Sequence, residues 1–136
     1  MNDAKDDWYN QIKKSPLTPP SIVFQIVWPV LYMVMIISFI IYFASFQDPN
    51  VNVWLSLGMI FFITQFVLNL LWSPIFFYYH HIWLALIIII LMIVFVILTI
   101  IQFVKVNSIS GFILVPYLIW LLFAFYLNLY ICLNNK

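Results

Sequence analysis

The sequence predicts an all-α membrane protein, an antiparallel bundle of transmembrane helices, on the strength of three observations. Of its 136 residues, 67% are hydrophobic and only 7% are charged, whereas about 25% of the residues of a typical soluble domain are charged. The hydrophobic residues gather in long runs, each sufficient to cross a hydrocarbon core about 30 Å thick as a helix. These runs are continuous rather than alternating, which argues against transmembrane β-strands.

Taken in chain order, the apolar runs predict four spans within a single domain that covers residues 1–136. The spans are expected at about 22–46, 53–79, 82–104 and 112–133, after a polar N-terminal loop over 1–21. The connections between them are short, so consecutive helices must run antiparallel. The first 21 residues are too polar for a signal peptide, and we expect no cleaved export signal.

The distribution of lysines predicts the orientation in the membrane. Four lysines fall on one side of the expected bundle and Lys105 falls on the other; the four are Lys5, Lys13, Lys14 and Lys136. The positive-inside rule therefore places both termini in the cytoplasm. We expect a multi-pass protein of a bacterial cell membrane.

Charge and chemistry exclude several function classes. The net charge is +1 and the chain has no arginine and no long basic run, so nucleic acid is not an expected partner. Every acidic residue lies outside the apolar runs, which argues against an ion-coupled pump. Inside the expected bundle the sequence offers no carboxylate pair, no metal triad and no serine with a nearby base, so no metal, required cofactor or hydrolytic residue is assigned.

Two other residue types carry less information. The one cysteine, Cys132, permits no internal disulfide and no cysteine cage for a metal. His80 and His81 stand side by side at a helix boundary. We interpret them as interfacial polar residues, with a ligand contact as the alternative.

Aromatic and amide side chains recur at helical spacing along three of the spans. The stripes consist of Phe24, Trp28, Tyr32 and Met35; of Gln65, Asn69, Trp72 and Phe76; and of Pro116, Trp120, Ala124 and Asn128. Turned inward, they would line a slot for a flat apolar ligand. In that interpretation Trp28 and Trp120 face each other across an open chamber. The alternative is plain helix packing, with the amides as interhelical hydrogen bonds.

The single residues near the span ends and inside the spans have simpler interpretations. Trp54 and Trp83 fall near predicted span ends, where an interfacial belt is expected. Prolines 29, 74 and 116 lie inside spans and should kink or interrupt them.

Several of these residues belong to motifs that resemble a known family. The motifs are Trp8-Tyr9, residues 14–20, Val27-Trp28, residues 68–77 and residues 116–128. In content, order and spacing they are similar to the TspO/MBR family of tryptophan-rich sensory proteins, which includes the translocator proteins, also called peripheral benzodiazepine receptors.

The resemblance implies a helical bundle that binds porphyrin-like tetrapyrroles, protoporphyrin IX or heme, for sequestration, regulation or transport. The implied ligand-binding residues are Tyr9, Trp28, Asn69, Trp72, Trp120 and Ala124. Residues 8–20 would form a lid over the pocket, or else a plain interfacial anchor. An enzymatic alternative is light- and oxygen-dependent porphyrin degradation, with Trp28 and Trp120 as electron donors. A third alternative is a ligand-free membrane interaction protein, including a homodimer.

The chain also departs from the family pattern. The family usually has five spans, and we expect four here because only seven residues, most of them polar, precede Trp8. Either the start is assigned too late, or this is a four-span variant closed by a neighbouring subunit or lipid. The family's sterol motif is met only formally, by Leu127, Tyr130 and Lys136, and we do not expect a sterol partner.

Overall fold

The computed structural model describes residue 16 and residues 21–46 and 50–134 of the chain. It contains four long helices: α2 (Ser21–Ala44), α3 (Leu57–Ser73), α4 (Ile82–Val106) and α6 (Val115–Asn134). Three short elements join them: a 3-10 turn η1 (Val53–Leu55), a π-helical turn η2 (Pro74–Tyr78) and the short helix α5 (Ser108–Phe112).

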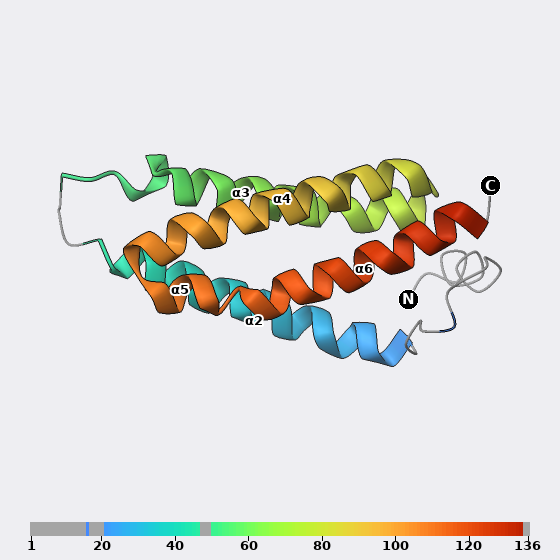
Figure 1. The fold of residues 1–136 in the computed structure, drawn as a ribbon, viewed down its shortest axis with the longest axis horizontal. Coiled ribbons are helices and arrows are strands. Elements are labelled where there is room, and N and C mark those ends of the chain that lie inside the picture. The colour runs from blue at the N-terminus through green and yellow to red at the C-terminus, as the bar shows by residue number, and fades with distance from the viewer. Residues whose placement is uncertain (1–15, 17–20, 47–49, 135–136) are drawn as a thin grey trace.

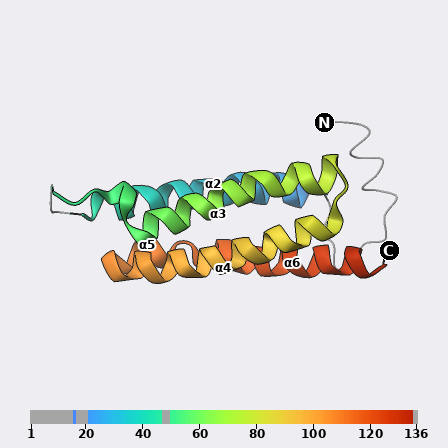
Figure 2. The same ribbon diagram turned by 90° about the horizontal axis from the view of Figure 1, so that it is seen from above.

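The long helices run up and down along one axis, as Figure 1 shows. Four segments of the described chain are long and apolar enough to cross a membrane, the last of them formed by α5 and α6 together. In Figure 2 they form two layers, α2 with α3 and α4 with α5 and α6. The all-α antiparallel bundle is therefore confirmed. Helices are the expected solution because, in lipid, every backbone polar group must find its partner inside the segment.

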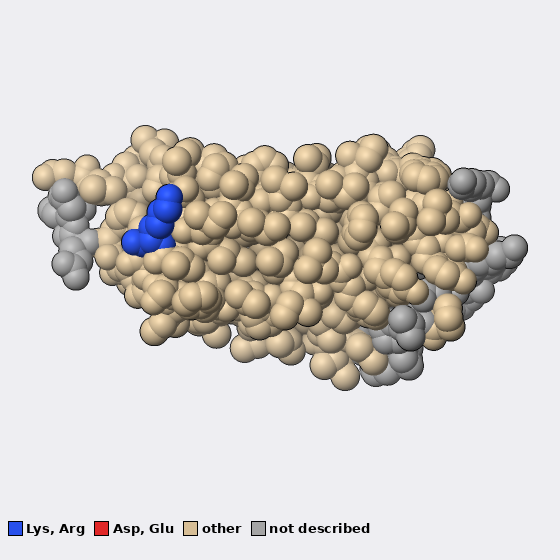
Figure 3. Space-filling view, viewed as in Figure 1, with Lys and Arg blue, Asp and Glu red and all other residues tan. Residues whose placement is uncertain are grey.

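The surface of the bundle is apolar. Exposed side chains such as Ile26 and Met33 on α2 and Ile119 on α6 are about 60% accessible. Lys105 is the one charged side chain among the described residues, and the blue atoms in Figure 3 lie at the end of the molecule where α4 and α5 meet. Such a surface is matched by hydrocarbon and not by water, so the protein is a multi-pass membrane protein in a lipid bilayer.

The bundle has two ends that differ in composition. The start of α2 and the end of α6 lie at the same end (Figure 1). We call this the tryptophan end, defined by Trp28, Trp72 and Trp120. The opposite end, with residues 50–57, the end of α4 and α5, is called the loop end. The termini themselves lie outside the described residues, so their cytoplasmic location stays a prediction.

The three prolines inside the expected spans have different effects. Pro29 lies within α2, which continues past it. Pro74 is the first residue of the π-helical turn η2, so α3 ends just before it. Pro116 is the second residue of α6, a position where its missing N–H costs no helical hydrogen bond. The expected span at 112–133 is interrupted at residues 113–114, just before Pro116, which is one of the two outcomes expected for a proline inside a span.

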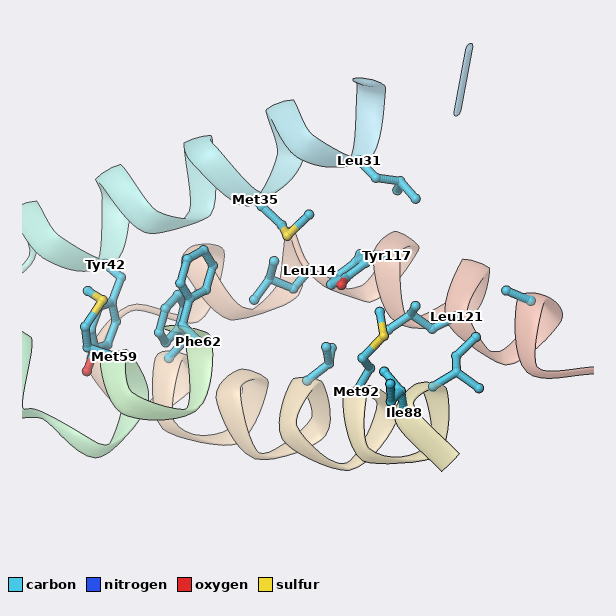
Figure 4. Packing of buried hydrophobic residues seen from close by; sticks show 14 of the residues in the cluster. Leu31, Met35, Tyr42, Met59, Phe62, Ile88, Met92, Leu114, Tyr117 and Leu121 are labelled. Carbon is cyan, nitrogen blue, oxygen red and sulfur yellow. The ribbon is translucent and has the colours of Figure 1, made fainter. Parts of the chain in front are cut away.

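The hydrophobic core extends along the whole length of the bundle, and all four long helices contribute side chains to it. Figure 4 shows Met35, Phe62, Met92 and Tyr117 converging from α2, α3, α4 and α6. Each of these side chains is no more than 7% exposed. This continuous packing holds the helices that carry the candidate site.

Candidate functional site

Two indoles meet between α2 and α6 at the tryptophan end. The ring centroids of Trp28 and Trp120 lie 6.3 Å apart with an interplanar angle of 88°, an edge-to-face contact. A flat ligand between two parallel rings needs about 7 Å, two van der Waals spacings. The structure therefore differs from the open chamber expected between these rings, because the indoles touch each other directly. A ligand that stacks on either ring must first separate them.

Beside the indoles, four side chains from three helices form a chain of hydrogen bonds. Tyr32 on α2 donates from its hydroxyl to Asn69 Oδ1 on α3 at 2.7 Å. Asn69 Nδ2 donates to the Tyr117 hydroxyl on α6 at 2.8 Å, and Tyr117 donates to Gln65 Oε1 on α3 at 2.8 Å. Gln65 Nε2 in turn donates to the sulfur of Met35 at 3.7 Å. We call Tyr32, Asn69, Tyr117 and Gln65 the amide–phenol chain.

The positions of these residues follow from helical periodicity. Gln65 and Asn69 are four residues apart on α3, so their side chains lie on one face. Tyr32 and Met35 are three apart on α2 and present a second such face. Asn69, Tyr117 and Gln65 are at most 5% exposed, whereas Tyr32 is half-buried. Buried polar groups at membrane depth need partners, and this chain supplies them from across the bundle.

A second polar contact ties the tryptophan end to the start of α4. Trp72 Nε1 donates to Asn128 Oδ1 at 3.1 Å, and Asn128 Nδ2 donates to the carbonyl oxygen of Ile82 at 3.3 Å. The Trp72 ring also stacks on Phe76, with centroids 5.1 Å apart. Trp72 is therefore fixed in place by both its ring and its indole nitrogen.

The turn before α4 has an unusual backbone. His80 adopts a positive φ of 58°, a conformation that is uncommon for residues other than glycine. It follows the π-helical turn η2, where the His81 N–H donates to the Ile75 carbonyl at 3.0 Å. Both His80 and His81 are exposed, in agreement with a polar boundary between two spans.

The structure brings together most of the residues expected from the sequence. Trp28, Trp120 and Asn69 lie around the contact of α2, α3 and α6, and Ala124 is 7% exposed on the turn of α6 after Trp120. Trp72 lies with Asn128 in the separate contact described above. Tyr9 and the expected lid over 8–20 fall outside the described residues, except for Pro16. Trp54 and Trp83 are each 51% exposed, and their interfacial location stays a prediction.

Sequence reasoning missed Tyr117, which is completely buried at the centre of the amide–phenol chain. The fourth-span stripe was counted in steps of four from Pro116, which is exposed. The buried face instead runs through Tyr117, Leu121, Ala124 and Asn128. Steps of four, three and four follow the 3.6-residue period more closely than equal steps of four, and this pattern could have identified Tyr117.

The chemistry available at the site is that of neutral rings and amides. The described residues contain no group of three side chains able to hold a metal ion. The residues around the two indoles supply stacking surface, hydroxyls and carboxamides. Such a set suits a flat, mostly apolar ligand with a few polar edge atoms.

Comparison with known proteins identifies the family. The model of the TspO/MBR family matches residues 1–133. Protein CrtK of Rhodobacter capsulatus is 33% identical over 121 residues, which span 89% of this chain and 74% of that protein. The tryptophan-rich protein TspO of Chlorobaculum tepidum is 34% identical over 122 residues, spanning 89% of this chain and 75% of that protein. The translocator protein of Ovis aries is 26% identical over 129 residues, spanning 95% of this chain and 75% of that protein. The chain belongs to the TspO/MBR family.

Proposed function

We propose that this protein binds porphyrin-like tetrapyrroles, protoporphyrin IX or heme, between α2, α3 and α6 at the tryptophan end, for sequestration, regulation or transport. The observation that carries the proposal is the contact of Trp28 with Trp120 immediately beside the hydrogen bond from Tyr32 to Asn69. Two large ring surfaces and two neutral polar groups come together there from three helices.

Ligand binding would exchange the contact between the two indoles for contacts between an indole and the ligand. The edge-to-face contact between the indoles is worth about 0.5–1.5 kcal/mol beyond the area it buries. A macrocycle that stacks on the face of either ring replaces that contact with a larger area of van der Waals contact. Membership of the TspO/MBR family supports the proposal, since the resemblance to that family implies a tetrapyrrole ligand.

The test is a titration of the protein in lipid nanodiscs with protoporphyrin IX, followed by tryptophan quenching and by the porphyrin absorption band. Replacing Trp28 and Trp120 together by Phe should weaken binding about tenfold, because the indoles supply the stacking surface. Trp83→Phe is the matched control, since Trp83 is 51% exposed at the start of α4. Equal affinity of the wild type and the double variant would remove the proposed site.

A second candidate function is light- and oxygen-dependent degradation of the bound porphyrin. It is favoured by the cluster of electron-rich rings, since the ring centroid of Trp28 lies 6.3 Å from that of Trp120 and 6.3 Å from that of Tyr32. Under illumination in air, bleaching of the porphyrin band should slow when either indole is replaced by Phe. Bleaching at the wild-type rate in both variants, at equal porphyrin occupancy, would exclude this activity. If the titration finds no porphyrin binding at all, the ligand-free interaction protein becomes the better explanation.

A further inference from the structure

The hydrogen bonds of the amide–phenol chain are all donated in the same direction along the chain. Each hydroxyl in it has one proton to give, and each carboxamide has one donating and one accepting end. In the structure the protons point from Tyr32 to Asn69, from Asn69 to Tyr117 and from Tyr117 to Gln65. Because Asn69 and Tyr117 each accept one hydrogen bond and donate one, the direction of one bond determines the direction of the others.

Tyr32 is the end of this chain that lies nearest the indoles. Its ring centroid is 6.3 Å from that of Trp28, and the residue is half-buried, while the other three members are buried. Since its proton is given to Asn69, the Tyr32 oxygen can offer only lone pairs to a ligand beside Trp28. In this direction the site receives a ligand that carries a hydrogen-bond donor on its edge.

The same side chains also satisfy one another in the opposite direction. If both carboxamides turn over, Gln65 donates to Tyr117, Tyr117 donates to Asn69 and Asn69 donates to Tyr32. The Tyr32 proton is then free to point at a ligand acceptor. The two directions differ at Met35, whose sulfur accepts from Gln65 Nε2 at 3.7 Å in the structure. In the reversed direction that sulfur faces an oxygen and has no proton to give, and a thioether is a weak acceptor, so the bias is small.

We propose that Tyr32 is a specificity-determining residue that presents either an acceptor or a donor to a flat ligand, according to the direction of the amide–phenol chain. Gln65 and Met35 are positioning residues that set the resting direction. The site therefore accepts flat ligands with a donor or an acceptor on the edge next to Tyr32. This inference rests on the proposed function in that a flat ligand lies beside Trp28.

The experiment compares two flat tricyclic compounds of nearly the same size and shape. Carbazole presents an N–H donor and fluorenone presents a carbonyl acceptor at the matching position. Both dissociation constants are measured by equilibrium dialysis with the full chain in lipid nanodiscs, and the readout is the ratio of carbazole Kd to fluorenone Kd. In Gln65→Leu, the only acceptor left to Tyr117 within the amide–phenol chain is Asn69, which holds the chain in the reversed direction. The ratio should rise about fivefold to tenfold, the effect of one hydrogen bond.

A second variant keeps the test independent of any folding defect in Gln65→Leu. Met35→Leu conserves volume and removes the weak acceptor, so the ratio should rise in the same sense by about twofold. Met59→Leu is the matched control, because Met59 is an equally buried methionine at the loop end. Its ratio should equal that of the wild type.

A double variant decides whether Tyr32 carries the effect. In a Tyr32→Phe background, Gln65→Leu should leave the ratio unchanged, since no hydroxyl remains to reverse. The inference is overturned if the ratio fails to respond to both Gln65→Leu and Met35→Leu. It is also overturned if the ratio responds equally without the Tyr32 hydroxyl, or if neither tricycle binds the wild type. Porphyrin binding, titrated in parallel, separates the two proposals: its loss with an intact ratio response removes only the proposed function.

Discussion

The two ends of the bundle are held together by different kinds of contact. At the loop end, the helices approach through short side chains, backbone and closely stacked rings. Ser38 Oγ donates to the Ser110 carbonyl at 2.6 Å, and the ring of Tyr42 stacks on Phe103 with centroids 3.9 Å apart. A methyl group added at Gly58 would lie 2.6 Å from the Tyr42 hydroxyl oxygen. These contacts are so close that a larger side chain at the loop end would force a helix to move.

At the tryptophan end, long side chains bridge the helices. Trp28 reaches Trp120 through ring edges, and Tyr32 reaches Asn69 through a hydroxyl and a carboxamide. Contacts of this kind change when a side chain rotates, and the helix axes can stay in place. We therefore expect the contacts at the loop end to contribute most of the stability of the bundle. The contacts at the tryptophan end should be the ones that adapt when a ligand binds.

The sharpest test of this comparison is the loss of a buried ring at the loop end. Phe103 is completely buried and packs against Tyr42 and Phe62. Phe103→Ala should lower the free energy of unfolding by about 3–5 kcal/mol, since the transfer and cavity costs add. Unfolding by sodium dodecyl sulfate from mixed micelles measures it. Phe112→Ala, at a ring 61% exposed, is the control and should change stability by at most about 0.5 kcal/mol.

A smaller effect is expected from overfilling the same end. The Cβ of an alanine at Gly111 would lie 2.3 Å from Val104 Cγ2 and 3.0 Å from the Ile100 carbonyl oxygen. Gly111→Ala should therefore cost about 1–3 kcal/mol, because α5 must move away from α4. The same unfolding titration checks it, with Ser108→Ala at an exposed position of α5 as the control. A neutral Gly111→Ala would mean that this junction is less tightly packed than its geometry indicates.

The smallest effect is expected at the tryptophan end. Tyr32→Phe removes one half-buried hydrogen bond of 2.7 Å and keeps the ring. Interhelical hydrogen bonds in membranes average about 0.6 kcal/mol, so the loss of stability should be near that value. Tyr130→Phe, on the last turns of α6, is the control for the substitution itself. If Tyr32→Phe destabilised the protein as much as Phe103→Ala, the contrast between the two ends would be wrong.

Composition and apolar run length were enough to predict the four-helix architecture, because the bilayer leaves few alternatives for such a chain. The face that each stripe presents was also predictable where the spacing was counted correctly, as for Gln65 and Asn69. Spacing gives a direction around a helix axis but not the distance to the next helix. The contact between Trp28 and Trp120 therefore could not be foreseen, and an open chamber was expected in its place.

Local breaks in the helices were predictable only in part. Pro74 and Pro116 indicated a kink or an interruption of the helix at each position. They did not indicate that Pro74 would begin a π-helical turn or that Pro116 would be the second residue of a helix. Those outcomes depend on how the neighbouring turns pack. The short helix α5 depends likewise on Asn107, whose side chain accepts from the Ile109 N–H at 2.9 Å and donates to Ser45 Oγ at 3.0 Å.

The edge-to-face pair of Trp28 and Trp120 should also give the protein an intrinsic spectroscopic signal that responds to ligand binding. Two indoles held 6.3 Å apart at a fixed angle couple their electronic transitions. They should therefore contribute a paired positive and negative band to the far-ultraviolet circular dichroism spectrum, in addition to the helical signal. Any molecule that wedges the rings apart would erase this couplet, so occupancy could be followed without a label and with colourless compounds.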